Sequence, residues 1–168
     1  MQDLLNLSQL ESQAPPRAEP LSVRDFAQAA WTQHRAEAER KGIRFENRVP
    51  PALSWNVEPR DLDLMLGNLI GNAVNYNPAG GKVRVEWDAD ASALRVRDTG
   101  HGIPAEMLPH VFERFYRADA ARARGEGTGL GLAIVKHAAQ RYGIQAAAES
   151  TLGEGSTFTL MVPPERIV

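Results

Sequence analysis

Two long segments of the chain carry apolar residues at the three- and four-residue spacing that places them on one face of an α-helix. The first spans residues 21–41, with Ser22 as a suitable N-cap and Gly42 just past its end. The second spans residues 61–76, where the apolar stripe predicts an inward face. That face consists of Leu62, Met65, Leu66, Leu69, Ile70 and Ala73.

Two further helices are predicted near the glycine-rich part of the chain and at its amino-terminal end. The first follows a glycine-rich stretch and runs to about Arg141. The second is a short stripe over residues 1–13, in which leucines lie three residues apart. Because this stripe stops before Pro15 and is too short to be stable alone, we interpret residues 1–19 as the end of a longer helix and a linker. Residues 20–168 are expected to form one folded domain.

Strands are predicted between these helices, where apolar and polar residues alternate or short apolar runs lie between turn residues. The segments are residues 43–46, 53–55, 83–87, 93–97, 144–149 and 157–162. The resulting order is helix, strands, helix, strands, helix, strands. This order predicts an α/β fold, a two-layer sandwich with helices on one face of a mixed sheet.

Composition narrows the class of protein. A chain of 168 residues with 43% hydrophobic content can bury one ordinary core. The absence of cysteine excludes a disulfide scaffold and thiolate chemistry. The net charge of −2 gives no reason to expect nucleic-acid binding. No signal peptide and no run of 18 apolar residues is present, so we expect no membrane contact by this chain.

The glycine-rich stretch at residues 125–131 is a candidate phosphate-binding loop. Four glycines in seven residues allow positive φ angles and close approach to a ligand, and the helix that follows favours phosphate at its start. A P-loop is excluded, because Leu132 stands where that motif needs lysine. A dinucleotide fingerprint needs a strand before the glycines, and residues 117–124 show no strand pattern. A flexible surface loop is the remaining alternative.

Polar side chains elsewhere supply candidate ligands. Asn68 and Asn72 lie four residues apart and project from one helix face. Their amides are either satisfied by nearby backbone or are oxygen ligands for Mg²⁺. Asp98 follows a predicted strand and precedes Gly100 and Gly102. Its carboxylate either forms an ordinary Asx turn or accepts a hydrogen bond from a buried amino group.

Aromatic and cationic residues adjoin each other just before the glycine stretch, in the segment VFERFYR at residues 111–117. This segment is either a core helix with a solvated face or a source of cations for phosphates. The candidate cations are Arg117, Arg122, Arg124 and Lys136.

Taken in order, these segments resemble the sequence boxes of two-component sensor histidine kinases. NLIGNAVNYNP is similar to the N box, DTGHGIP to the first glycine box and VFERFYR to the F box. GEGTGLGLAIVK is similar to the second glycine box and GEGSTFTL to the third. Residues 20–168 therefore resemble the catalytic ATP-binding domain of that family, which has the Bergerat (GHKL) fold. FYRADAARARGEGTGLGLAIVKHA and the terminal PPERIV look most like phosphate-regulon sensor kinases.

The resemblance implies roles for individual residues at the adenine and metal end of a nucleotide site. Asp98 would accept a hydrogen bond from the adenine amine, with Gly100 and Gly102 shaping the pocket. Asn72 would bind Mg²⁺ and Asn68 would assist it in catalysis. The other implied ATP contacts are Asn75, Tyr76, Ile103, Phe112, Phe115, Gly127, Thr128, Gly129, Leu130, Gly131 and Leu132.

The phosphate end follows from the same resemblance. Arg117 and Arg122 would contact phosphates and serve catalysis. The glycine stretch would cradle the phosphates at the helix start. Phe112 and Phe115 would anchor a mobile lid between Arg117 and Gly127.

The chain departs from the family pattern at two places. Asn75 stands where many members have a phosphate-binding lysine. No His-Glu-x-x-Thr-Pro phosphoacceptor motif is present, and residues 1–13 resemble only the last turns of the second dimerisation helix. The four histidines of the chain are His34, His101, His110 and His137.

The function implied is transfer of the ATP γ-phosphoryl group, with Mg²⁺, to a histidine on a separate dimerisation domain for relay to a response regulator. The location implied is cytoplasmic, with the parent protein anchored in the bacterial inner membrane. Two rivals are a GHKL ATPase of the gyrase, Hsp90 or mismatch-repair type and a nucleotide-binding scaffold without activity. Asn68 disfavours the ATPase, because an amide cannot replace the glutamate that activates water there.

Overall fold

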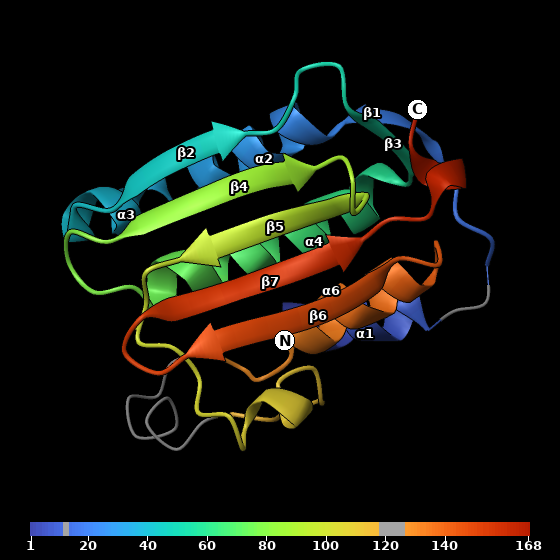
Figure 1. Cartoon of the computed structure of the whole chain (residues 1–168). Coiled ribbons are helices and arrows are strands. Elements are labelled where there is room, and N and C mark those ends of the chain that lie inside the picture. Colours follow the sequence, from blue (N-terminus) through green and yellow to red (C-terminus); the bar gives the residue numbers. More distant parts are fainter. Residues whose placement is uncertain (12–13, 118–126) are drawn as a thin grey trace.

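A five-stranded mixed sheet forms one layer of the computed structural model, which describes residues 1–11, 14–117 and 127–168 (Figure 1). The strand order is β2-β4-β5-β7-β6, with β2 and β4 parallel and the other neighbours antiparallel. The strands are β2 (Arg44–Arg48), β4 (Lys82–Asp88), β5 (Ala93–Asp98), β6 (Gln145–Thr151) and β7 (Gly155–Met161). The predicted two-layer α/β sandwich is confirmed.

The second layer consists of helices that lie behind one face of the sheet (Figure 1). They are α1 (Gln2–Leu10), α2 (Val23–Gln33), α3 (Arg35–Lys41), α4 (Pro59–Asn75) and α6 (Gly131–Gln140), with short 3₁₀ turns at Leu108–His110 and Pro164–Arg166. Among the residues that the structure describes, no helix is long and apolar enough to span a bilayer.

The helix predicted over residues 21–41 is divided into α2 and α3 at His34. The His34 ring lies against α4, where Nε2 is 3.2 Å from the carbonyl oxygen of Gly67. A Cβ atom on Gly71 would come within 2.8 Å of the same ring, so this ring needs a glycine opposite it. The predicted caps hold, because Ser22 Oγ accepts from the N–H of Asp25 and Gly42 ends α3 with φ of +65°.

A second, two-stranded sheet was not predicted from the sequence. It pairs β1 (Glu19–Ser22) antiparallel with β3 (Ser54–Val57). The pattern predicted β3 but assigned residues 21 and 22 to a helix and the residues before them to a linker. The four residues of β1, which begin Glu-Pro, carry no strand pattern of their own. They become a strand because they pair with β3, and the sequence alone does not reveal this pairing.

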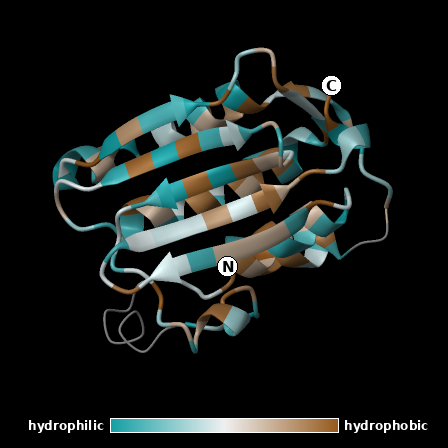
Figure 2. Ribbon diagram, in the orientation of Figure 1, coloured by the Kyte–Doolittle hydropathy of each residue, from teal (hydrophilic) through white to brown (hydrophobic). Residues whose placement is uncertain are grey.

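The core lies between the sheet and α4. The side chains of Leu62, Met65, Leu66, Leu69 and Ile70 are each no more than 1% exposed. The opposite face of the sheet carries alternating polar residues and has no helix over it in Figure 2. There Glu46 pairs with Lys82, Arg84 and Arg48, and these cations lower the pKa of its carboxyl to about 2.

A buried polar group joins the start of α4 to the end of α6. Asp61 is 1% exposed, and its Oδ2 accepts hydrogen bonds from Tyr142 Oη and from Arg141 at 2.7 Å. Tyr142 Oη in turn accepts from the N–H of Glu58 at 3.1 Å. Burial raises the pKa of both the Asp61 carboxyl and the Tyr142 phenol. The hydroxyl therefore donates to a buried carboxyl group and accepts from a partly buried backbone N–H.

Replacing Tyr142 with phenylalanine is expected to destabilise the fold by about 1–3 kcal/mol, because a buried carboxylate loses a donor and the N–H of the N-cap residue Glu58 loses an acceptor. Urea unfolding measures the change. Tyr116→Phe is the control, since no hydrogen bond to the Tyr116 hydroxyl is found among the described residues, and its effect should stay within about 0.5 kcal/mol. Equal losses in the two variants would contradict the assigned role of the Tyr142 hydroxyl.

Candidate functional site

A cavity of about 380 Å³ lies where α4, the start of α6 and the ends of β5 and β7 meet. Asn68 and Asn72 enter its wall from α4, and Asp98 enters from the end of β5. Thirteen residues assigned to a nucleotide site from the sequence line it: Asn68, Asn72, Asn75, Tyr76, Asp98, Gly102, Ile103, Arg117, Gly127, Thr128, Gly129, Gly131 and Leu132. Segments far apart in the sequence are thus brought to one site.

Other assigned residues lie away from the cavity wall. Leu130 is 2% exposed and belongs to the core, and Phe115 is 60% exposed. Phe112 packs edge-on against Phe158, with ring centroids 6.2 Å apart. Gly100 is buried behind Asp98, to which its N–H donates at 2.8 Å. Arg122 and most of the expected lid lie outside the described residues.

The two asparagines of α4 have different environments. Asn68 Nδ2 donates to the carbonyl oxygen of Leu64 at 2.8 Å, so its Oδ1 points the other way. A Cβ atom on Gly131 would come within 2.8 Å of this Oδ1, which shows how closely the start of α6 approaches α4. The Asn72 amide makes no hydrogen bond with the part of the chain that the structure describes. Its oxygen is therefore available to a ligand.

Asp98 presents one carboxylate oxygen to the backbone and the other to the cavity. Oδ1 accepts from the N–H groups of Gly100 at 2.8 Å and Ser156 at 3.3 Å. Within the described residues no donor reaches Oδ2. Burial raises the pKa of the carboxyl to about 6, although the two backbone hydrogen bonds act to lower it. The group can accept a hydrogen bond from a ligand above that pH.

The hairpin of β6 and β7 braces the loop that follows Asp98. Ser150 Oγ accepts from the N–H of Ile103 at 2.7 Å and lies 2.8 Å from the carbonyl oxygen of Gly155 and 2.9 Å from Ser156 Oγ. The N–H of Gly153 donates to the carbonyl oxygen of His101 at 2.7 Å. Sequence reasoning assigned no role to Ser150, because an isolated serine on a strand carries no distinguishing pattern.

Close backbone contacts explain two of the glycines in this loop and hairpin. A Cβ atom on Gly102, where φ is +74°, would lie 2.2 Å from the carbonyl oxygen of Thr151. A Cβ atom on Gly155 would lie 2.0 Å from the carbonyl oxygen of Asp98. Because no side chain fits at either position, the glycines fix how closely the loop and the hairpin meet.

The glycine stretch forms another part of the cavity wall. Gly127 and Gly129 have φ angles of +73° and +75°, which other residues rarely adopt. The carbonyl oxygen of Gly129 accepts from the N–H of Phe115 at 2.9 Å, which ties the stretch to the segment before it. Gly131 then begins α6 at the cavity wall, so the start of this helix faces the site.

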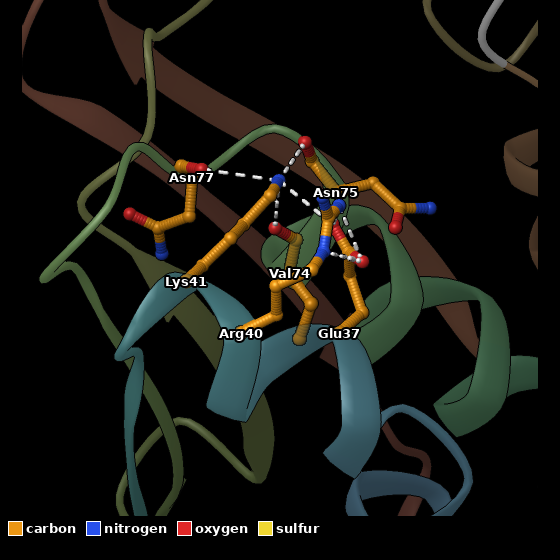
Figure 3. Close-up of polar contacts among 6 residues, drawn as sticks. All are labelled: Glu37, Arg40, Lys41, Val74, Asn75 and Asn77. Carbon is orange, nitrogen blue, oxygen red and sulfur yellow. Dashed lines mark hydrogen bonds and ion pairs between the residues drawn. The ribbon is translucent and has the colours of Figure 1, made fainter.

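Lys41 holds the end of α4, which carries Asn75 and Tyr76 (Figure 3). Its Nζ donates to the carbonyl oxygens of Val74, Asn75 and Asn77 at 3.1, 2.9 and 3.3 Å. These carbonyls lie in and just after the last turn of α4, where the regular hydrogen bonds of the helix end. The side chain of Asn75 points away from Lys41 in Figure 3. Lys41 therefore fixes the backbone beneath Asn75, and its ammonium group is already occupied by three carbonyl oxygens and by the Glu37 carboxylate at 3.6 Å.

Seven cavity residues were not among those assigned from the sequence. Met107 is an apolar wall residue outside the motif segments, whereas His101 belongs to DTGHGIP, Val111 and Tyr116 to VFERFYR, and Ser156 and Phe158 to GEGSTFTL. The full set is Asp3, His101, Met107, Val111, Tyr116, Ser156 and Phe158. Five of the seven therefore carried a sequence signal through their motifs, and Asp3 and Met107 carried none.

Residues 57–166 match the family described as Histidine kinase-, DNA gyrase B-, and HSP90-like ATPase. The signal transduction histidine-protein kinase AfsQ2 of Streptomyces coelicolor is 45% identical over 109 residues, which are 65% of this chain and 20% of that protein. The phosphate regulon sensor protein PhoR of Pseudomonas aeruginosa is 36% identical over 171 positions, covering 99% of this chain and 39% of that protein. The chain thus spans between a fifth and two fifths of these curated relatives.

The fold also matches solved structures. Full-length ShkA in complex with AMPPNP superposes with a TM-score of 0.78 and is 25% identical, over 94% of this chain and 34% of that one. The resemblance to sensor histidine kinases found in the sequence is confirmed by these similarities.

Ser150→Ala is expected to loosen the loop after Asp98, because the N–H of Ile103 loses its acceptor. Hydrogen exchange at residues 100–103 should accelerate roughly fivefold or more, which corresponds to losing about 1 kcal/mol of local protection. Ser150→Thr keeps the hydroxyl and should exchange like the native chain. Unchanged exchange in the alanine variant would show that the hairpin does not brace the loop.

Proposed function

Because the chain belongs to the family of histidine kinase-, DNA gyrase B- and HSP90-like ATPases and is a catalytic domain of the sensor histidine kinase kind, we propose that it binds ATP with Mg²⁺ and transfers the γ-phosphoryl group to a histidine on a separate dimerisation domain. One observation carries the proposal. A single cavity is lined both by a carboxylate acceptor, Asp98, and by a glycine-rich helix start, residues 127–131.

The Asp98 end suits adenine. Oδ2 is free to accept from an exocyclic amine, while Oδ1 is fixed by two backbone donors. Ile103, Met107 and Phe158 supply apolar surface around the position of the ring. Guanine carries a carbonyl where adenine has its amine, so the ionised carboxylate would repel it. The site therefore selects adenine over guanine.

The glycine end suits phosphates. The N–H groups at the start of α6 lack intrahelical partners, and the helix dipole adds partial positive charge. Arg117 at the cavity wall adds a full positive charge. Arg122 is proposed to contribute a second cation from the segment outside the described residues. The chain's contribution to transfer is then positioning and charge neutralisation rather than a covalent step.

The residues present fit a magnesium ion. Asn72 has an amide oxygen available at the cavity, and Mg²⁺ in such sites takes few protein ligands and is completed by water and phosphate oxygens. In the described part of the chain, no cluster of three histidine, cysteine or acidic residues forms a closed metal cage. Asn72 would hold the ion with Asn68 beside it, and the bound ion would neutralise phosphate charge.

The rival ATPase function requires a base that activates water. Asn68 occupies the position where that branch has a glutamate, and its amide Nδ2 is already committed to the carbonyl oxygen of Leu64. An amide has no useful basicity near neutral pH. Slow hydrolysis preserves ATP for transfer, which favours the kinase over the ATPase.

The acceptor histidine is proposed to lie on another domain of the same kinase, from which a response regulator receives the phosphoryl group. Within the chain, His34 contacts the carbonyl oxygen of Gly67 and His110 pairs with Glu113 at 2.7 Å. Residues 1–19 are proposed to be the end of a dimerisation helix and a linker, and residues 20–168 the catalytic domain. We also propose that the domain acts in the cytoplasm, within a parent protein anchored in the inner membrane.

Adenosine affinity is expected to fall as pH drops through about 6, because only the ionised Asp98 accepts from the amine. Binding selects the ionised form, so affinity is full above pH 7 and declines up to tenfold per unit below the pKa of the free carboxyl. Adenosine is the probe because it has no phosphate to titrate. Calorimetry from pH 5 to 8 measures the profile.

Two matched comparisons sharpen that test. Asp98→Asn should bind adenosine roughly ten- to a hundredfold more weakly at pH 8, because a charged hydrogen bond contributes about 1.5–3 kcal/mol. The adenosine affinity of this variant should not change between pH 5 and 8. Inosine, with a carbonyl in place of the amine, should bind the native chain poorly. Equal affinity for adenosine and inosine would exclude Asp98 as the adenine acceptor.

Incubated with γ-labelled ATP, the chain is expected to bind nucleotide without labelling itself, because its histidines lack a phosphoacceptor context. Adding a dimerisation domain with an intact acceptor histidine should produce acid-labile label on that domain, weakly, since the two are not covalently linked. A partner with the acceptor changed to alanine is the control. Rapid multiple-turnover release of phosphate would instead support the ATPase.

A further inference from the structure

The amino-terminal helix α1 reaches the phosphate end of the cavity through one carboxylate. Thr128 Oγ1 donates to Asp3 Oδ2 at 2.6 Å, and Asp3 lies in the cavity wall with Gly127 and Gly129. Thr128 belongs to the glycine stretch proposed above to receive the phosphates. A negative charge therefore lies on the loop that would meet the most negatively charged part of the ligand.

Contacts along α1 hold Asp3 in this place. Leu7 and Leu10 are 3% and 7% exposed and pack in the core, and α1 lies beside α6 (Figure 1). Asn6 Oδ1 accepts from Arg60 of α4 at 2.9 Å. Just past the helix, Glu11 forms an ion pair with Arg114. The helix is thus docked at several points, and Asp3 is its contact with the glycine stretch.

We propose that α1 competes with the phosphates of ATP for the glycine stretch, so that the docked helix lowers nucleotide affinity. The inference rests on the proposed function. A threonine hydroxyl has one proton to donate, so Asp3 and a phosphate oxygen cannot both accept it. Their like charges also repel, and because this contact is exposed to solvent the repulsion is greatest at low salt. Full nucleotide binding therefore requires the first turn of α1 to leave Thr128.

This competition makes α1 a regulatory element of the site. Any event that pulls the first turn of α1 away from Thr128 raises ATP affinity, and any event that stabilises its docking lowers it. By linkage, bound ATP weakens the docking of α1 by the same factor. Adenine recognition is not involved, because Asp3 hydrogen-bonds to Thr128 of the glycine stretch, whereas Asp98 lies at the end of β5 and is held there by Gly100 and Ser156.

The isosteric variant Asp3→Asn tests the competition in the whole chain. Calorimetry at low salt should show ATP binding about tenfold tighter than in the native chain, with a larger gain without Mg²⁺, when the ligand carries more negative charge. Adenosine affinity should be unchanged. Glu11→Gln, which breaks the ion pair beyond the other end of α1, should give a smaller gain in the same direction. Asp25→Asn, an exposed charge on α2, is the control and should change nothing.

A second readout follows the helix itself. Hydrogen exchange at residues 2–10 should accelerate when the native chain is saturated with ATP and should not change with adenosine. If ATP binds Asp3→Asn as tightly as it binds the native chain, α1 does not compete with the phosphates. If the variant binds ATP with Mg²⁺ more weakly, the competition is also overturned, because Asp3 would then be a ligand of the cation. A native chain that binds no adenine nucleotide would overturn the proposed function as well, whereas native binding with no effect of Asp3→Asn overturns only the competition.

Discussion

The hydrogen bonds that fix the Asp98 carboxylate at the end of β5 are the interaction on which the site depends. Two backbone N–H groups, from Gly100 and Ser156, hold Oδ1, and this leaves Oδ2 for a ligand. The arrangement needs very close backbone contacts. A Cβ atom on Gly100 would lie 2.6 Å from Oδ1, and the loop and hairpin meet only where glycines allow it. Burial in this place raises the pKa of the carboxyl to about 6, against the effect of the two backbone hydrogen bonds, and makes recognition of an amine dependent on pH.

The glycine-rich part of the cavity wall has a different physical basis. There the start of α6, the positive φ angles of Gly127 and Gly129 and the charge of Arg117 provide an environment for anions. Asp3 contacts Thr128 of the glycine stretch and not Asp98. Movement of α1 is therefore expected to change the affinity for the phosphates without changing the affinity for adenine. Rigid adenine recognition and adjustable phosphate binding can therefore coexist in one cavity.

Much of this could be predicted from the sequence, because helical periodicity, strand alternation and the glycine boxes are local patterns. The periodicity placed α4 and its inward face, and the motifs brought Asn72, Asp98 and Gly129 into one expected site. Contacts between distant segments could not be predicted. The break at His34 depends on a ring that lies against α4, and β1 forms by pairing with β3. The positions of Ser150 and Asp3 likewise depend on how the hairpin and α1 pack against the domain.

A crystal structure of the chain with a non-hydrolysable ATP analogue and Mg²⁺ tests the central claim most directly. We expect the adenine amine within hydrogen-bonding distance of Asp98 Oδ2, the ion bound to Asn72 Oδ1 and the phosphates at residues 127–131. An analogue bound outside this cavity, or with its adenine at the glycine stretch and its phosphates near Asp98, would contradict the account.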